Sequence, residues 1–90
     1  MRVITGSAKG HKLKGPPDIG TRPMLDRVKE SLFAILTGYD VIHGRVLDLF
    51  AGTGALGIEF LSRGAEWADF VEQRAAVCKV IRENLAHTKL

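Results

Sequence analysis

Three glycines, Gly52, Gly54 and Gly57, form the most distinctive chemical pattern of the chain, G-x-G-x-x-G. They follow a mostly apolar run and open a segment whose apolar residues recur at helical spacing. Glycine lets a ligand approach the backbone closely, and the first N–H groups of a helix are free to donate hydrogen bonds to it. An acid, Glu72, stands twenty residues after Gly52, and its carboxylate can accept hydrogen bonds from two ribose hydroxyls. The combination predicts a site for a nucleoside cofactor; the alternative is a turn that only packs a strand against a helix.

Asp48 indicates which nucleoside cofactor the site takes. It lies inside the apolar run, four residues before Gly52, where burial of a carboxylate is costly unless the carboxylate is paired. Beside the pyrophosphate of NAD or FAD its charge would be repulsive, whereas beside the cationic tail and sulfonium of S-adenosylmethionine it would be attractive. We therefore expect S-adenosylmethionine. A nicotinamide- or flavin-binding fragment remains the alternative, and Asp48 can also cap the turn through backbone N–H groups.

The elements that must position these residues alternate between strand and helix. Hydrophobic patterning predicts a strand buried on both faces, a helix, a second strand and a further helix, over residues 45–50, 55–63, 66–71 and 74–87. This order is a βαβ unit with parallel strands, so the fold class is α/β. Because two parallel strands make an incomplete sheet, we expect these residues to be the front part of a larger domain; the alternative is a small domain completed by the N-terminal hairpin or by dimerisation. Self-association through the exposed sheet edge is a further expectation.

The first 23 residues are predicted to form a basic arm and loop, and residues 24–90 the cofactor-binding part of the domain. Residues 1–13 have the pattern of a short β-hairpin with a basic rim, and the glycine- and proline-rich residues 15–23 that of a loop. Residues 24–37 are predicted to be a helix with an apolar stripe of Leu25, Val28, Leu32, Ile35 and Leu36.

The charge of the chain is concentrated near its start. Residues 1–30 carry seven lysines and arginines against three acids, a net +4, while residues 31–90 carry a net −1. A basic arm on a near-neutral body favours an anionic partner, with nucleic acid first; a solvated cationic surface and a basic nucleic-acid-binding module without catalysis are the alternatives.

The remaining composition excludes several classes of site. The single cysteine, Cys78, cannot form an intramolecular disulfide, and the three histidines lack metal-ligand spacing, so we expect no metal site and a cytoplasmic location. No run reaches the roughly 18–20 apolar residues of a membrane span, so we expect no membrane partner.

Two stretches carry a resemblance to a known family. The sequence Val-Leu-Asp-Leu-Phe-Ala-Gly-Thr-Gly at residues 46–54 resembles motif I of the class I S-adenosylmethionine-dependent methyltransferases, and Phe-Val-Glu at residues 70–72 resembles their acidic second-strand motif. More specifically, the chain resembles the bacterial 16S ribosomal RNA guanine-N2 methyltransferases of the RsmD type. The matches cover nearly the whole chain and include residues 1–4, 6–13, 21–23, 27–33, 47–57, 59 and 62–65.

The resemblance implies a Rossmann-like methyltransferase fold and methyl transfer to the exocyclic N2 amine of a guanine in 16S ribosomal RNA. It implies that the cofactor is bound by Asp48, Phe50, Ala51, Gly52, Thr53, Gly54, Glu72 and Gln73. It implies that RNA or substrate is faced by Lys9, Lys12, Lys14, Arg22 and Pro23. Methyltransferases of this type grip the target amine with an Asn/Asp-Pro-Pro-aromatic tetrapeptide, which these 90 residues lack. We therefore expect no catalytic residue among them and no methyl transfer by these residues alone.

Overall fold

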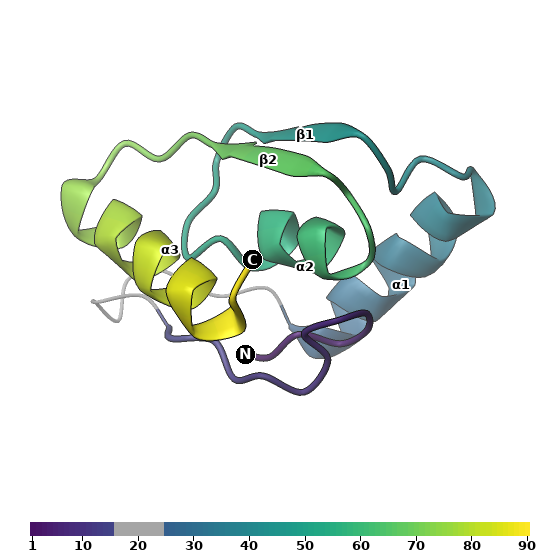
Figure 1. The fold of residues 1–90 in the computed structure, drawn as a ribbon, viewed down its shortest axis with the longest axis horizontal. Helices are drawn as coiled ribbons and strands as arrows, with labels where there is room; N and C mark the ends of the chain where they lie inside the picture. Colours follow the sequence, from purple (N-terminus) through teal and green to yellow (C-terminus); the bar gives the residue numbers. More distant parts are fainter. Residues whose placement is uncertain (16–24) are drawn as a thin grey trace.

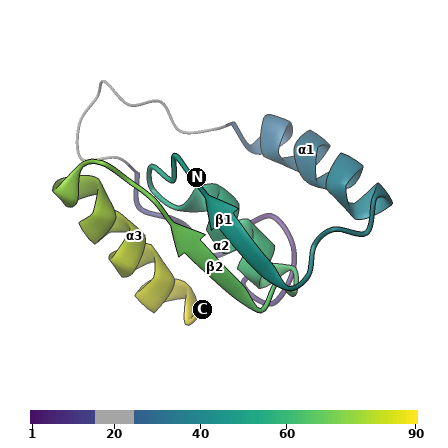
Figure 2. The same ribbon diagram turned by 90° about the horizontal axis from the view of Figure 1, so that it is seen from above.

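The computed structural model describes residues 1–15 and 25–90. Its regular elements are, in chain order, α1 (Asp26–Gly38), β1 (Arg45–Asp48), α2 (Ala55–Ser62), β2 (Trp67–Phe70) and α3 (Ala75–Thr88). The two strands form one layer and the helices lie below it, with residues 1–15, here called the N-terminal segment, below the helices (Figure 1). Seen from above, α1 lies on the side of β1 and α3 on the side of β2 (Figure 2). The predicted loop over residues 15–23 and the predicted helix start at residue 24 lie almost wholly outside the described residues.

The strands pair in parallel, as the βαβ pattern predicts. Their register runs from Arg45 opposite Trp67 to Asp48 opposite Phe70. Two backbone hydrogen bonds continue the pairing beyond the strands, from Val71 N to Asp48 O and from Ala51 N to Val71 O, each 2.9 Å long. The carboxyl ends of both strands therefore meet at one edge of the sheet.

The expectation that residues 45–50 are buried on both faces is wrong. Exposure alternates along β1, and Leu47 and Phe50 are largely open to solvent, Phe50 at 94%. All three helices lie on one side of the sheet, and no described element covers its other face (Figure 1). The apolar composition of a strand shows that the strand can be buried. Whether its side chains are exposed depends on which elements pack against the strand.

The second and third helices follow their predicted bounds to within one residue, and each buries part of its apolar residues, with Leu85 of the predicted inward face only half-buried. On α2, Ile58 is fully buried, and Gly57 lies so close to β2 that a Cβ there would come 2.3 Å from a ring carbon of Phe70. On α3, the inward-facing Val77, Val80 and Ile81 are buried. Glycine at position 57 thus sets the distance between the first helix of the unit and the sheet.

The N-terminal segment folds back on itself as the hairpin pattern predicts, but it has no regular strands. An antiparallel bridge pairs Arg2 with Lys12, and backbone hydrogen bonds also join the two halves, from Val3 N to His11 O, from Gly10 N to Val3 O and from Leu13 N to Met1 O. Val3, Ala8 and Leu13 are buried and form one core cluster with Ala55 and Ile58 of α2. The segment is therefore docked on the helix layer through these three apolar side chains, while its lysines stay exposed to solvent.

The apolar stripe predicted for α1 is also wrong in part. Phe33 is fully buried, but Leu25, Val28 and Ile35 are at least half exposed. The other buried residue of α1 is Lys29, which is 2% exposed. This helix is attached to the body through Phe33, whose ring packs 4.8 Å from that of Phe60, and through the buried charge of Lys29.

That charge belongs to a cluster centred on Glu59 of α2, which is 0% exposed. The Glu59 carboxylate accepts hydrogen bonds from Ile4 N at 2.9 Å, Thr5 N at 3.1 Å and Arg63 Nε at 2.8 Å. Lys29 Nζ lies 3.2 Å from it and donates to Arg2 O at 2.6 Å. Burial alone would raise the pKa of Glu59, but these hydrogen bonds and the lysine charge outweigh burial and hold the pKa below its ordinary value.

None of the helices in the described ranges is both long enough and apolar enough to cross a membrane.

Candidate cofactor site at the glycine turn

The glycine turn, residues 51–54, joins the end of β1 to the start of α2. A hydrogen bond of 2.9 Å from Gly54 N to Ala51 O closes it. Gly52 has φ +53° and Gly54, the N-cap of α2, has φ +87°. Since these left-handed values suit glycine and strain most other residues, the first and second glycines of the motif are required by the shape of the turn itself.

Three consecutive residues of the turn are each held by a different partner. Ala51 N donates to the backbone of Val71, as described above. Gly52 N donates to Glu72 Oε1 at 3.1 Å. The carbonyl oxygen of Thr53 accepts a hydrogen bond of 3.0 Å from Asn84 Nδ2 of α3. The turn is therefore fixed from the neighbouring strand and from the following helix, as a preorganised binding site requires.

Glu72 lies where both strands end. Its second oxygen, Oε2, accepts from Arg74 N at 2.9 Å, and its side chain is 13% exposed. A carboxylate has about four lone-pair directions, so two hydrogen bonds leave capacity for further donors. Beside it opens a cavity of about 440 Å³ lined by Leu49, Phe50, Val71, Glu72, Gln73 and Arg74. The structure thus brings Phe50, Glu72 and Gln73 of the predicted set to one cavity.

Asp48 lies elsewhere. The backbone N–H groups of Phe50 and Gly57 face its carboxylate, which is compatible with the capping role left open above. It lines a separate, smaller cavity of about 180 Å³ with Leu56 and Phe60. Its Oδ2 is buried and has no hydrogen-bond partner in the described part of the chain. Burial raises the pKa of Asp48, against the lowering effect of the two backbone hydrogen bonds.

Replacing Asp48 with Asn is expected to separate stability from binding. Because the pKa is raised, ionised Asp48 costs stability near neutral pH, and the cost disappears as the pH falls through the raised pKa toward the ordinary value of 3.8. The variant should therefore be at least as stable as the wild type near neutral pH. Its affinity for a cationic cofactor should fall about tenfold, the equivalent of about 1.4 kcal/mol. Urea denaturation and calorimetric titration measure the two effects, and a variant that loses stability but keeps affinity would contradict the expectation.

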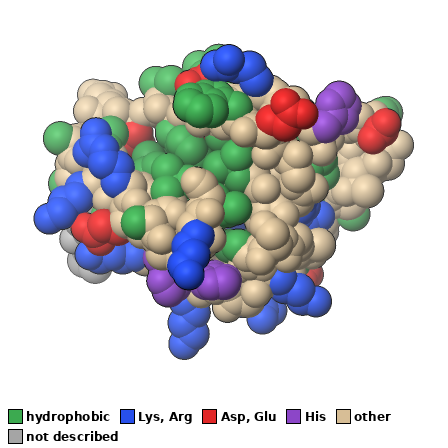
Figure 3. Space-filling model, viewed as in Figure 1, with side chains coloured by type: hydrophobic (Ala, Val, Ile, Leu, Met, Phe, Trp, Pro, Cys, Tyr) green, Lys and Arg blue, Asp and Glu red, His purple; other side chains and the backbone are tan. Residues whose placement is uncertain are grey.

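The predicted RNA-facing lysines lie on the other side of the helix layer from the sheet. Lys9 and Lys12 are exposed on the N-terminal segment and form no ion pair with a described residue. Lysine, arginine and histidine side chains gather at the bottom of the view in Figure 3. The rings of His11, on the N-terminal segment, and His87, on α3, are 5.4 Å apart. Lys14 forms an ion pair of 2.6 Å with Glu83. Arg22 and Pro23 lie outside the described residues.

Sequence reasoning missed three polar residues that organise the site and its support: Asn84, Glu59 and Lys29. Each stands within the inward face of a helix, and Asn84 follows Val77 and Ile81 at helical spacing. A polar residue on an otherwise apolar face was the available signal, because such a residue is buried only if it has partners.

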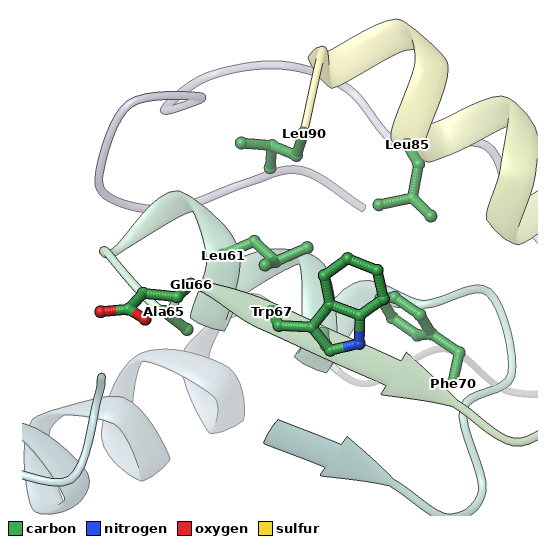
Figure 4. Close-up of a pocket in the computed structure, with 8 residues that line it drawn as sticks. Leu61, Ala65, Glu66, Trp67, Phe70, Leu85 and Leu90 are labelled. Atoms are coloured by element: carbon green, nitrogen blue, oxygen red, sulfur yellow. The ribbon is translucent and has the colours of Figure 1, made fainter. Parts of the chain in front are cut away.

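A cavity of about 550 Å³ lies between α2, β2 and α3. Figure 4 shows Leu61, Trp67, Phe70, Leu85 and Leu90 around it, along the edge of β2 away from β1, while the carboxylate of Glu66 points away from it. In Figure 3 the same region is a hydrophobic surface. Ligand sites combine apolar walls with convergent polar groups, and this cavity has no such polar groups in the described residues. The smaller cavity beside Glu72 is the better candidate.

The fold and the glycine turn together define the class of protein. Among solved structures, the chain is similar to yhhF of Escherichia coli, provisionally named a methyltransferase, with a TM-score of 0.84 and 42% identity over 99% of this chain and 47% of that chain. It is also similar to a hypothetical protein of Thermus thermophilus, with a TM-score of 0.86 and 36% identity over 100% of this chain and 51% of that chain. The chain therefore has part of a Rossmann-like methyltransferase fold, as expected.

The chain belongs to the protein family described as conserved hypothetical protein 95, which matches residues 1–90. It is 48% identical over 90 residues to YlbH of Bacillus subtilis (strain 168), provisionally named an rRNA methyltransferase, covering 100% of this chain and 48% of that protein. It is 44% identical over 89 residues to ribosomal RNA small subunit methyltransferase D of Escherichia coli (strain K12), covering 99% of this chain and 44% of that protein. The resemblance to RsmD-type proteins is thus confirmed. The chain spans about half the length of the curated relatives it matches.

Proposed function

We propose that this chain supplies the cofactor-binding part of an enzyme that transfers a methyl group from S-adenosylmethionine to the N2 amine of a guanine in 16S ribosomal RNA. The observation that carries the proposal is the Glu72 carboxylate, bound to the glycine turn and lining a cavity where both strands end. In this proposal, residues 1–23 form the basic, RNA-facing part of the chain and residues 24–90 form the cofactor-binding part. The names of the relatives support ribosomal RNA as the substrate and, with it, a cytoplasmic location.

The residues present fit S-adenosylmethionine. Glu72 retains hydrogen-bonding capacity for ribose hydroxyls, and Leu49, Phe50 and Val71 offer apolar walls for the adenine ring. The buried Oδ2 of Asp48, unpaired among the described residues, would be satisfied by a cationic group or by a water that bridges to one. When bound, the cofactor supplies an electrophilic methyl group on its sulfonium. The glycine turn is held at three successive residues, and it would orient the part of the cofactor that lies against it.

The main alternative is a site for NAD or FAD, whose glycine pattern is shared. Asp48 disfavours NAD or FAD, because its buried negative charge would lie near the negative charge of a pyrophosphate bound at the turn. A basic nucleic-acid-binding module without catalysis is the other alternative, and it would bind no nucleoside cofactor.

Calorimetric titration with S-adenosylhomocysteine and with NAD distinguishes these alternatives. We expect the sulfur nucleoside to bind more tightly than NAD. Replacing Glu72 with Gln should weaken its binding about tenfold, or about 1.4 kcal/mol, because hydrogen bonds to a charged acceptor are replaced by weaker ones. Gln keeps one oxygen that can accept from Gly52 N. Glu66, exposed immediately before β2, provides the matched control Glu66→Gln. Tighter binding of NAD, or equal losses in both variants, would contradict the proposal.

Binding to ribosomal RNA is expected to be strongly salt-dependent. Each exposed lysine that neutralises a phosphate adds about one unit or less to the slope of log affinity against log salt. Replacing Lys9 or Lys12 with Ala should therefore lower the slope by that amount, and Lys14→Ala should lower it less, since Lys14 is already paired with Glu83. Filter binding at several salt concentrations measures the slope. An affinity that does not change with salt would exclude the predicted phosphate contacts.

A further inference from the structure

Asn84 joins two parts of the chain that are far apart in sequence. It lies on α3, and its side chain is buried, with 2% of the residue exposed. Its Nδ2 donates to Thr53 O at 3.0 Å and to Lys14 O at 3.1 Å. Its Oδ1 accepts from Lys14 N at 2.7 Å. One amide group thus connects the glycine turn with the N-terminal segment.

The orientation of this amide is determined by its partners. Both donors on Nδ2 face carbonyl oxygens, and the acceptor Oδ1 faces an N–H group, so the flipped amide would place like groups against each other. The bond to Thr53 O is buried and the two bonds to Lys14 are partly buried, and an unmade hydrogen bond in such positions is expensive. The arrangement therefore has one satisfied state, which requires the turn and the segment to be in place together.

The contact with the turn falls at a sensitive position. The Thr53 carbonyl belongs to the peptide plane that ends at Gly54 N, and Gly54 is the N-cap of α2. The neighbouring anchors of the turn are Val71 and Glu72, which follow β2, so Asn84 is the anchor that α3 contributes. Without the hydrogen bond from Asn84, the peptide group between Thr53 and Gly54 would be free to rotate, and this peptide group sets the direction of the first N–H groups of α2.

We propose that Asn84 is a positioning residue for cofactor binding, which holds the glycine turn in its binding geometry and couples that geometry to docking of the N-terminal segment at Lys14. The inference rests on the proposed function. A ligand that requires one arrangement of the turn loses affinity in proportion to the fraction of molecules that leave it. Because coupling is reciprocal, bound cofactor should in turn stabilise the contact at Lys14.

The coupling can be observed without an activity assay. In the wild-type protein, S-adenosylhomocysteine should slow hydrogen exchange at the Lys14 amide, whose N–H is bound by Asn84 Oδ1. In the variant Asn84→Ala this protection by the ligand should disappear, and the affinity for S-adenosylhomocysteine should fall about tenfold, or about 1.4 kcal/mol. Thr88→Val is the matched control, because the buried Thr88 hydroxyl bonds only backbone carbonyls of α3, among them Asn84 O at 2.8 Å. It removes a buried hydrogen bond from the same helix without touching the turn.

A second variant keeps the test decisive if Asn84→Ala does not fold. Asn84→Asp retains the size of the side chain and the acceptor for Lys14 N, but its ionised form cannot donate to Thr53 O. Protonation restores one donor, so its affinity relative to the wild type should recover as the pH is lowered, which a general loss of stability would not produce. Affinities equal to that of Thr88→Val, or no recovery at low pH, would overturn the role of Asn84 while leaving the cofactor assignment intact. A wild-type protein that binds no S-adenosylhomocysteine would overturn the proposed function and, with it, this inference.

Discussion

Replacing Glu59 with Gln is expected to lower the free energy of unfolding by about 3–5 kcal/mol near neutral pH, the usual cost of removing one partner from a buried ion pair. Glu59 accepts hydrogen bonds from two backbone N–H groups and from Arg63, and it balances the buried charge of Lys29. In the variant an NH₂ group would face these donors, and Lys29 would stay buried without a counter-charge. Urea denaturation measures the loss.

The same variant should change the acid stability of the protein. Since the pKa of Glu59 is lowered in the folded state, its contribution is fully present above the ordinary value of 4.5 and is lost as the pH falls through the lowered value. The free energy of unfolding of the wild-type protein should decline as the pH falls below 4.5. In Glu59→Gln this decline should be smaller by the part that protonation of Glu59 causes. Glu83→Gln is the control, because Glu83 pairs with Lys14 at the surface, where such pairs contribute little. Equal stability of the two variants would show that the buried cluster contributes no more than a surface pair.

Replacing Gly6 with Ala should cost about 3 kcal/mol, which combines a left-handed backbone with overpacking. Gly6 has φ +93°, and a Cβ there would lie 1.9 Å from the backbone oxygen of Ser62. The neighbouring contacts would be strained as well, since Ser7 N donates to that oxygen at 2.8 Å and Ala8 N donates to Ser62 Oγ at 3.0 Å. We therefore expect the N-terminal segment to be displaced from the end of α2.

Gly10→Ala separates the two causes. Gly10 has φ +87°, close to that of Gly6, but a Cβ there would have no heavy atom within 4 Å among the described residues. Its replacement should cost only the conformational term of about 1–2 kcal/mol. The difference between the two variants in urea denaturation is then the steric cost of the contact with Ser62. Equal losses would mean that the segment can move away from α2 without penalty.

The sequence predicted the βαβ unit because each of its parts carries a local signal. The glycine spacing marks the turn after β1, and the period of the apolar residues marks α2 and α3 to within one residue. Gly57 adds a packing signal that the structure explains through Phe70. These features depend on residues close together in the chain, so they could be predicted from pattern alone.

What could not be predicted depends on partners far away in the chain. Nothing near Lys29 shows that Glu59, thirty residues later, will bury its charge. The apolar stripe of α1 gave the wrong burial for Ile35, because no described element packs on that side of the helix. Asp48 and Glu72 flank the same turn in sequence but line different cavities, since Asp48 lies on the inner face of β1 and Glu72 follows the end of β2.

The partners of the N-terminal segment are made long after the segment itself. Ile4 and Thr5 donate to Glu59, and Ala8 donates to Ser62, across separations of 54–55 residues. At a synthesis rate of about 5–20 residues per second, about 3–11 seconds pass between the two ends of these bonds. During that interval Val3, Ala8 and Leu13 have no α2 to cover them. During translation, the apolar side chains of the N-terminal segment therefore stay exposed until α2 has been made. A ribosome that stalls before residue 59 leaves this segment undocked.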